Sequence, residues 1–256
     1  MKLLNTLEHL DSHTRSVQIW RIAQVLFWFV GIGMVMSLIF IPSLGLNLVW
    51  NILIPVAPAL LVIATGTWRN ICPLAFTFLL PKRLGFSKKI NISSQTLSLL
   101  SLIGLILLLI IVPLRHLLLN SNGMATAMVL IAVGILAFCL GLFFESKSGW
   151  CSALCPVHQV EKLYGSNVML SAPNAHCKEC NKCTIPCPDA TPGIHPLSSE
   201  KSIYSRIAGH LIVGGFPGYI WGWFQVPDYL GKDGVSHLDI IYGYPLGGMF
   251  LSLIIY

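Results

Sequence analysis

Charged side chains are scarce in this chain. Only 10% of its 256 residues are Asp, Glu, Lys or Arg, whereas soluble domains carry about 25%. Hydrophobic residues make up 55% of the sequence, and its mean hydropathy is +0.74. This composition excludes an ordinary water-soluble domain and indicates an integral membrane protein.

Several common catalytic motifs are also missing. The sequence has no glycine-rich phosphate loop, no dinucleotide-binding fingerprint and no hydrolytic triad pattern. It also lacks the C-x-x-C-H motif that attaches c-type haem. Nothing in the sequence therefore supports nucleotide-dependent, hydrolytic or covalent-haem chemistry.

Long apolar runs are present instead. A transmembrane helix needs about 20 apolar residues, and such runs occupy residues 20–40, 46–65, 96–119, 124–144, 203–224 and a last stretch from Ile240. We therefore expect an all-α integral membrane protein with about six transmembrane helices. The last run ends at Tyr256 without a polar tail, so we expect either a longer natural chain, which is the favoured explanation, or a partner that covers this end.

Positive charges gather in two of the connections. The first has no acid, and its basic residues are Arg69, Lys82, Arg83, Lys88 and Lys89. The second contains Lys147, Lys162, Lys178, Lys182 and Lys201. Residues 41–46 and 120–123 carry no charge, and residues 225–239 carry three Asp against one Lys. Because cytoplasmic loops collect Lys and Arg, we expect the N-terminus and both basic connections on the cytoplasmic side of a bacterial inner membrane. The net charge of +6 then reflects topology and lipid contact, and no nucleic-acid partner is expected.

The second basic connection is the longest polar stretch of the chain. It divides the sequence into four expected helices over 1–144, with a basic Cys-Pro loop at 66–95, a cytoplasmic domain over 145–202 and two helices over 203–256. The connection holds six of the eight cysteines. A domain of this size normally relies on disulfides or metals, and the reducing cytoplasm disfavours disulfides. We therefore expect a metal site.

Four of these cysteines stand within eleven positions, with a proline after the last: Cys177, Cys180, Cys183, Cys187 and then Pro188. A structural zinc site usually takes two cysteine pairs separated by a longer arm. The spacing of two, two and three residues is instead typical of bacterial ferredoxins, in which three cysteines hold one [4Fe–4S] cube and the fourth ligates another. The motif favours iron–sulfur over zinc.

A second set of ligands is available if Cys187 belongs to another cube. Cys151 and Cys155 precede Pro156, like the second half of a ferredoxin motif. By the same rule Cys155 completes the first cube, and the second cube takes Cys151, Cys187 and the Cys-Pro thiol Cys72. The fourth ligand is not assigned. Cys139 lies in an expected helix, where a cysteine is more often a small core hydrophobe, and the alternatives are His158, His176, a ligand from another subunit or an open position. We favour two [4Fe–4S] clusters; with a single cluster, Cys72 and Cys151 would not be ligands.

Residues 66–190 resemble the membrane-bound polyferredoxins of the NapH, NosR and CcoG types. The resemblance rests on "TWRNICP", "WCSALCP" and the C-x2-C-x2-C-x3-C-P motif. It implies that Cys151, Cys155, Cys177, Cys180, Cys183 and Cys187 are cluster ligands and that Cys72 is an additional Cys-Pro thiol. It also implies electron transfer between the quinone pool or a cytoplasmic donor and a partner redox enzyme, or support of that enzyme's metal-site maturation.

We therefore expect a non-catalytic electron-transfer subunit of a larger membrane redox complex. Two alternatives stay open: an assembly factor that handles or reduces metal through its Cys-Pro thiols, and an iron–sulfur redox sensor. The sequence does not specify the electron donor, the acceptor, the direction of flow or the pathway.

Two histidines and a group of glycines lie within the expected helices. Two histidines can ligate haem b axially, but His116 lies near the outer end of its helix and His210 about two turns from the inner end of another. The difference in depth disfavours haem and favours a hydrogen-bonded core histidine or a contact to a quinone head group. The glycines around Pro217 predict close packing against another helix or subunit, with a cofactor groove as the alternative; they are Gly209, Gly214, Gly215 and Gly218.

Overall fold

The computed structural model describes residues 2–88, 90, 92–144, 149–164, 202–229 and 236–256. For residues 2–17, and for some positions between 61 and 69 and between 152 and 164, it describes the backbone alone. Helices account for 88% of the described residues, and no strand occurs among them. The expected all-α class is confirmed.

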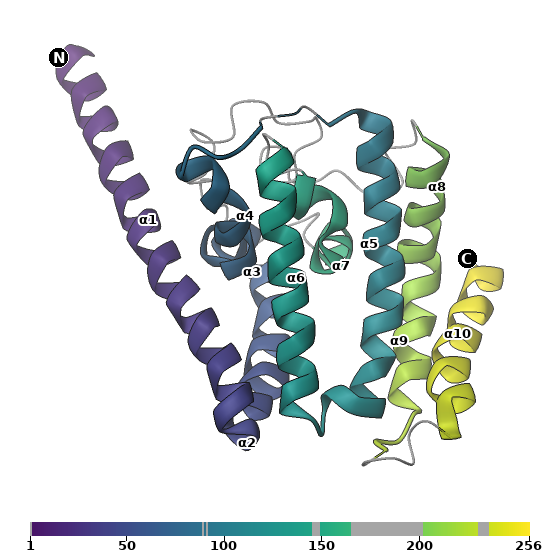
Figure 1. The fold of residues 1–256 in the computed structure, drawn as a ribbon. Coiled ribbons are helices and arrows are strands. Elements are labelled where there is room, and N and C mark those ends of the chain that lie inside the picture. Colours follow the sequence, from purple (N-terminus) through teal and green to yellow (C-terminus); the bar gives the residue numbers. More distant parts are fainter. Residues whose placement is uncertain (1, 89, 91, 145–148, 165–201, 230–235) are drawn as a thin grey trace.

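The long helices of the described chain run up and down the bundle in alternating directions (Figure 1). In chain order the described helices are α1 (Lys2–Phe40), α2 (Pro42–Asn47), the π-helical turn η1 (Leu48–Leu53), α3 (Ile54–Ile71), α4 (Pro73–Arg83), α5 (Ser94–Leu114), the π-helical turn η2 (Arg115–Leu119), α6 (Gly123–Phe143), the π-helical turn η4 (Trp150–Leu154), α7 (Pro156–Tyr164), α8 (Ile203–His210), the π-helical turn η6 (Leu211–Gly215), α9 (Phe216–Phe224) and α10 (Leu238–Ile255).

Five helical segments of the described chain are long and apolar enough to cross a membrane, which makes this a multi-pass membrane architecture. They are Gln18–Phe40, Pro42–Leu60, Ser94–Leu119, Gly123–Phe143 and Leu238–Ile255. The expected fifth run, 203–224, is helical throughout as α8, η6 and α9, but it is not among the five, because Arg206, His210 and several glycines lower its hydropathy. It lies beside α5 and α10 (Figure 1), and its crossing of the membrane stays a prediction.

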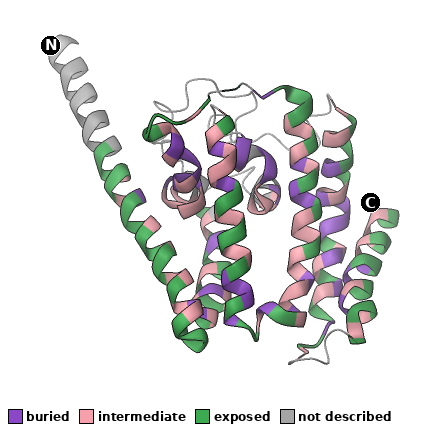
Figure 2. Ribbon diagram, viewed as in Figure 1, coloured by how far each residue is buried: buried purple, intermediate pink, exposed green. Residues whose placement is uncertain are grey.

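Exposed apolar side chains cover the outer faces of the bundle. Figure 2 shows exposed residues along α1, α6 and α10, with buried ones turned toward neighbouring helices. Large side chains such as Ile19, Phe40 and Phe250 are 66%, 71% and 64% exposed. Because lipid tails are as apolar as these side chains, the pattern suits a bundle surrounded by hydrocarbon.

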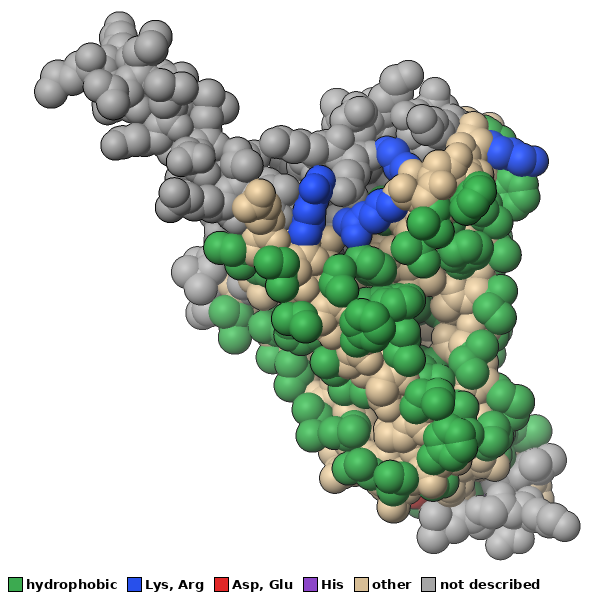
Figure 3. Space-filling model, turned by 60° about the vertical axis from the view of Figure 1, so that its left-hand side comes forward, with side chains coloured by type: hydrophobic (Ala, Val, Ile, Leu, Met, Phe, Trp, Pro, Cys, Tyr) green, Lys and Arg blue, Asp and Glu red, His purple; other side chains and the backbone are tan. Residues whose placement is uncertain are grey.

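The two ends of the bundle carry opposite charges. We call the end with Lys82, Arg83, Lys88 and Arg206 the basic end; Figure 3 shows Lys and Arg side chains gathered there. The opposite end, where α9 and α10 are connected, carries Asp228 and Asp239, and we call it the acidic end. This separation agrees with the charge distribution that the sequence predicted.

Glycines bring α9 and its preceding turn against α10, as the sequence predicted. A Cβ atom at Gly218 or Gly248 would collide with the backbone of the other helix. The Ser252 hydroxyl donates a hydrogen bond to the Gly214 carbonyl at 2.6 Å. The expected close packing against another helix is confirmed, with α10 of the same chain as the partner.

A candidate site at two Cys-Pro helix breaks

Cys72 and Cys155 occupy the same kind of backbone break. Their φ and ψ angles are −59° and 120° at Cys72 and −62° and 119° at Cys155. In each case the next residue is a proline that begins a short helix, α4 after Cys72 and α7 after Cys155. Proline disfavours α-helical geometry at the preceding residue and is well placed at the first position of a helix. The two Cys-Pro pairs therefore impose the same interrupted geometry locally.

Each break places a thiol at the positive end of a helix. The backbone N–H of Phe76 donates to the Cys72 carbonyl at 3.2 Å, so the first turn of α4 begins at the cysteine. At the other break, the Cys155 N–H donates to the Trp150 carbonyl at 3.0 Å and closes η4. The N-terminus of a helix stabilises negative charge, and the thiolate is the form of cysteine that binds metal. Both partly buried thiols therefore stand where the ligating form is favoured.

The helix that follows Cys72 and the turn that contains Cys151 share one hydrophobic cluster. Its buried members come from α4, α6 and η4 and are Phe78, Leu79, Ala137, Trp150 and Leu154. Cys151 and Cys155 pack against this cluster, and Trp150 at its centre is 1% exposed. The structure therefore joins, in one core, two Cys-Pro segments about 80 residues apart in sequence.

Helix α5 fixes the position of η4 and α7. A Cβ atom on Gly104 would lie 2.7 Å from the Leu154 carbonyl oxygen, so only glycine allows this close approach without a shift. The buried Gln159 amide donates to the Ser101 hydroxyl at 2.9 Å. Backbone contact and hydrogen bond together hold the second Cys-Pro break against α5.

The remaining predicted ligands are not placed. Cys177, Cys180, Cys183, Cys187 and His176 lie outside the described residues, and so does the side chain of His158. Within the described part of the chain, no three His, Cys, Asp or Glu side chains stand close enough to hold a metal ion. Thiolates are the donors that iron–sulfur clusters use, but the cubes predicted to take Cys72, Cys151 and Cys155 require further thiols from 177–187. The ligand assignments, the ferredoxin-like fold of the loop and both clusters therefore stay predictions.

The two histidines predicted to lie within membrane helices are at opposite ends of the bundle. His116, in η2 near the acidic end, is 8% exposed, and its Nδ1 lies 2.5 Å from Asp228 Oδ1. His210, in α8, is exposed, and its Nδ1 lies 2.8 Å from the Arg206 carbonyl oxygen. This placement agrees with the predicted difference in depth, and the hydrogen-bonded core histidine predicted as one alternative is found at His116.

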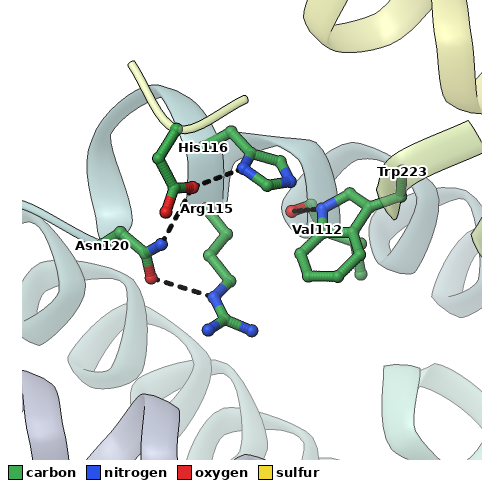
Figure 4. Close-up of polar contacts among 6 residues, drawn as sticks. Val112, Arg115, His116, Asn120 and Trp223 are labelled. Atoms are coloured by element: carbon green, nitrogen blue, oxygen red, sulfur yellow. Dashed lines mark hydrogen bonds and ion pairs between the residues drawn. The ribbon is translucent and has the colours of Figure 1, made fainter. Parts of the chain in front are cut away.

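The surroundings of Arg115, the neighbour of His116, were not predicted from the sequence. Its guanidinium lies between the rings of Trp50 and Trp223, 5.0 Å and 5.5 Å from their centroids. Its Nε donates to the Asn120 side-chain oxygen at 2.9 Å (Figure 4). The one signal in the sequence was an arginine inside an apolar run, because both tryptophans are distant along the chain.

Comparison of the chain with family models, curated proteins and solved structures found no match. The evidence for the membrane architecture and for the shared core of the two Cys-Pro segments is therefore the structure alone. The function implied by the resemblance of residues 66–190 to membrane-bound polyferredoxins is therefore a proposal.

Proposed function

We propose that this chain is a membrane-anchored iron–sulfur electron-transfer subunit of the polyferredoxin type. It relays single electrons between the quinone pool or a soluble cytoplasmic donor and a partner redox enzyme. The observation that supports this most is the shared core of the two Cys-Pro breaks. That core holds Cys151 and Cys155 and precedes the segment 165–201, which contributes four more thiols in ferredoxin spacing.

The proposed ligands divide into two groups. Cys155 completes the cube of Cys177, Cys180 and Cys183, and the second cube takes Cys72, Cys151 and Cys187 with one further ligand. When bound, such clusters supply one-electron redox chemistry at a potential set by charge, sulfur hydrogen bonds and solvent exposure. The chain's own contribution is an apolar wall. Trp150 and Leu154, 1% and 6% exposed, keep water from the side of Cys151 and Cys155 that faces the core.

The basic end is the cytoplasmic end in this proposal, because Lys and Arg collect on that side of membrane proteins. A reducing cytoplasm also keeps the thiols of 177–187 available as ligands. A membrane-impermeant maleimide applied to oriented vesicles tests this orientation. We expect these thiols, after cluster removal, to react only from the cytoplasmic side; reaction only from the outer side would overturn it.

A matched pair of cysteine variants tests the ligand assignment. Cys155 and Cys139 are both partly buried, but only Cys155 is assigned to a cube. We expect Cys155→Ser, purified without oxygen, to lose about four irons per chain, the content of one cube, and Cys139→Ser to keep the full content. Equal iron in both variants would contradict the assignment.

Reduction of the intact protein then tests the relay. We expect quinol or a soluble donor to reduce the clusters rapidly and reversibly, with stable EPR signals. Substoichiometric or exchangeable metal would indicate an assembly factor instead, and cluster loss with altered partner binding would indicate a sensor.

A further inference from the structure

Arg115 is a cation inside a membrane-spanning segment. It lies within the span Ser94–Leu119 and near its acidic end. Ionisable residues inside membrane spans are rare and mark functional sites. Among the Lys and Arg residues whose side chains are described, Arg115 is the one that lies at this end of the bundle. The grouping of Lys and Arg at the basic end therefore does not account for a positive charge at this position.

The side chain of Arg115 is held in one orientation from three sides. The Trp50 and Trp223 rings flank its guanidinium, and Asn120 accepts a hydrogen bond from its Nε. The tryptophans are themselves fixed, since Trp50 Nε1 donates to the Leu119 carbonyl at 2.9 Å and Trp223 Nε1 to the Val112 carbonyl at 3.2 Å. Aromatic stacking and a fixed Nε leave the two amino groups of the guanidinium as a pre-oriented pair of donors.

These two amino groups have no acceptor in the described part of the chain. Among the residues that the structure describes, none forms a hydrogen bond or ion pair with either Nη atom. The nearby carboxylate of Asp228 is used elsewhere, because its Oδ1 contacts His116 Nδ1 at 2.5 Å and accepts from Asn120 Nδ2 at 3.2 Å. In Figure 4 the amino groups of Arg115 point away from Asn120. Leaving charged donors unmatched in a partly apolar setting is costly, so a complementary acceptor is expected from outside the described residues.

We propose that Arg115 binds the phosphodiester group of a membrane phospholipid in the adjacent leaflet. A guanidinium presents two parallel N–H donors that match two phosphate oxygens, and tryptophans are favoured at the depth of the head groups. Apolar side chains beside the site are open to the acyl chains: Leu118 and Phe224 are 42% and 70% exposed. A free phosphate ion would make no use of that surface. This site is independent of the cysteines and goes beyond the proposed electron relay.

Native mass spectrometry of the delipidated full-length protein tests the proposal. We expect one tightly retained lipid per chain with phosphatidylethanolamine or phosphatidylglycerol, and none with dioleoylglycerol, which lacks phosphate. Arg115→Gln should weaken retention roughly tenfold or more, as the loss of a charge-assisted hydrogen-bonded pair implies. The matched control is Arg206→Gln, an exposed arginine in α8 at the opposite end, which should retain this lipid like the unaltered chain.

A second variant distinguishes the loss of lipid binding from misfolding. Arg115→Lys keeps the charge but removes the planar pair of donors, so we expect retention between those of the unaltered chain and Arg115→Gln, with circular dichroism unchanged. Unchanged retention in Arg115→Lys or Arg115→Gln would overturn the proposal, as would equal retention of dioleoylglycerol. Displacement of the lipid by millimolar inorganic phosphate would show an anion site that does not select lipid, and would also overturn it.

Discussion

The cysteines at the basic end of the bundle and the arginine and histidine at its acidic end are held by different kinds of interaction. At the basic end, Cys151 and Cys155 pack against the buried side chains of Trp150 and Leu154. At the acidic end, Arg115 and His116 are held by hydrogen bonds and ring contacts, and Asp228, which pairs with His116, is 55% exposed in its side chain. Positions fixed by close packing respond strongly to changes of volume, whereas a partly solvated polar contact contributes little. The cysteine core should therefore be the more sensitive end.

The largest effect is expected at the centre of the cysteine core. Trp150→Ala removes a fully buried indole and leaves a cavity beside Cys151 and Cys155, which should lower the free energy of unfolding by about 3–5 kcal/mol. The measurement is denaturant unfolding in detergent, together with iron content. Trp221→Ala is the control, because Trp221 is 61% exposed and should change neither quantity appreciably. Comparable losses of stability and iron in both variants would show that burial of Trp150 in this core is not what makes it important.

An added methyl group tests the contact between α5 and η4. Gly104→Ala places a Cβ atom against the Leu154 and Ala153 carbonyls, and such overpacking typically costs about 1–3 kcal/mol. Gly134→Ala, in α6, meets nothing within 4 Å and should be neutral or slightly stabilising, since alanine is the better helix former. The unfolding midpoints of the two variants give the comparison. If Gly104→Ala behaves like Gly134→Ala, then α5 does not fix the second Cys-Pro break.

The smallest effect is expected at the acidic end. Asp228→Ala removes a hydrogen bond to a histidine, but because Asp228 is largely exposed the loss should be about 1 kcal/mol or less. In this variant we also expect faster hydrogen exchange at the Tyr229 amide, which donates to the His116 carbonyl at 3.2 Å. Asp239→Ala, also at the acidic end but in the first turn of α10, should leave that amide unchanged. If Asp228→Ala lowers the free energy of unfolding as much as Trp150→Ala does, the cysteine core is not the more sensitive end.

Local sequence predicts the helices well and the tertiary contacts poorly. The expected runs 96–119 and 124–144 correspond to the spans Ser94–Leu119 and Gly123–Phe143, because length and apolarity alone decide such helices in a bilayer. Run 203–224 was also recognised as helical, although its polar residues and glycines leave it less apolar than the others. The prolines after Cys72 and Cys155 likewise predict breaks, since their effect on the preceding residue is local.

Contacts between distant segments were beyond such reasoning. The meeting of α4 with η4 depends on Phe78 and Trp150, whose packing no local pattern encodes. The common contact of Trp50 and Trp223 with Arg115 likewise joins residues far apart in the sequence. The cysteines of 177–187 remain known by their spacing alone.

Iron and acid-labile sulfide per chain, measured on anaerobically purified protein together with EPR, test the central claim most directly. The account predicts about eight of each, the content of two cubes, with signals of reduced [4Fe–4S] clusters. About four of each would leave a single cube and remove Cys72 from the ligands. Protein that is free of iron, or that carries zinc on these thiols, would contradict the account.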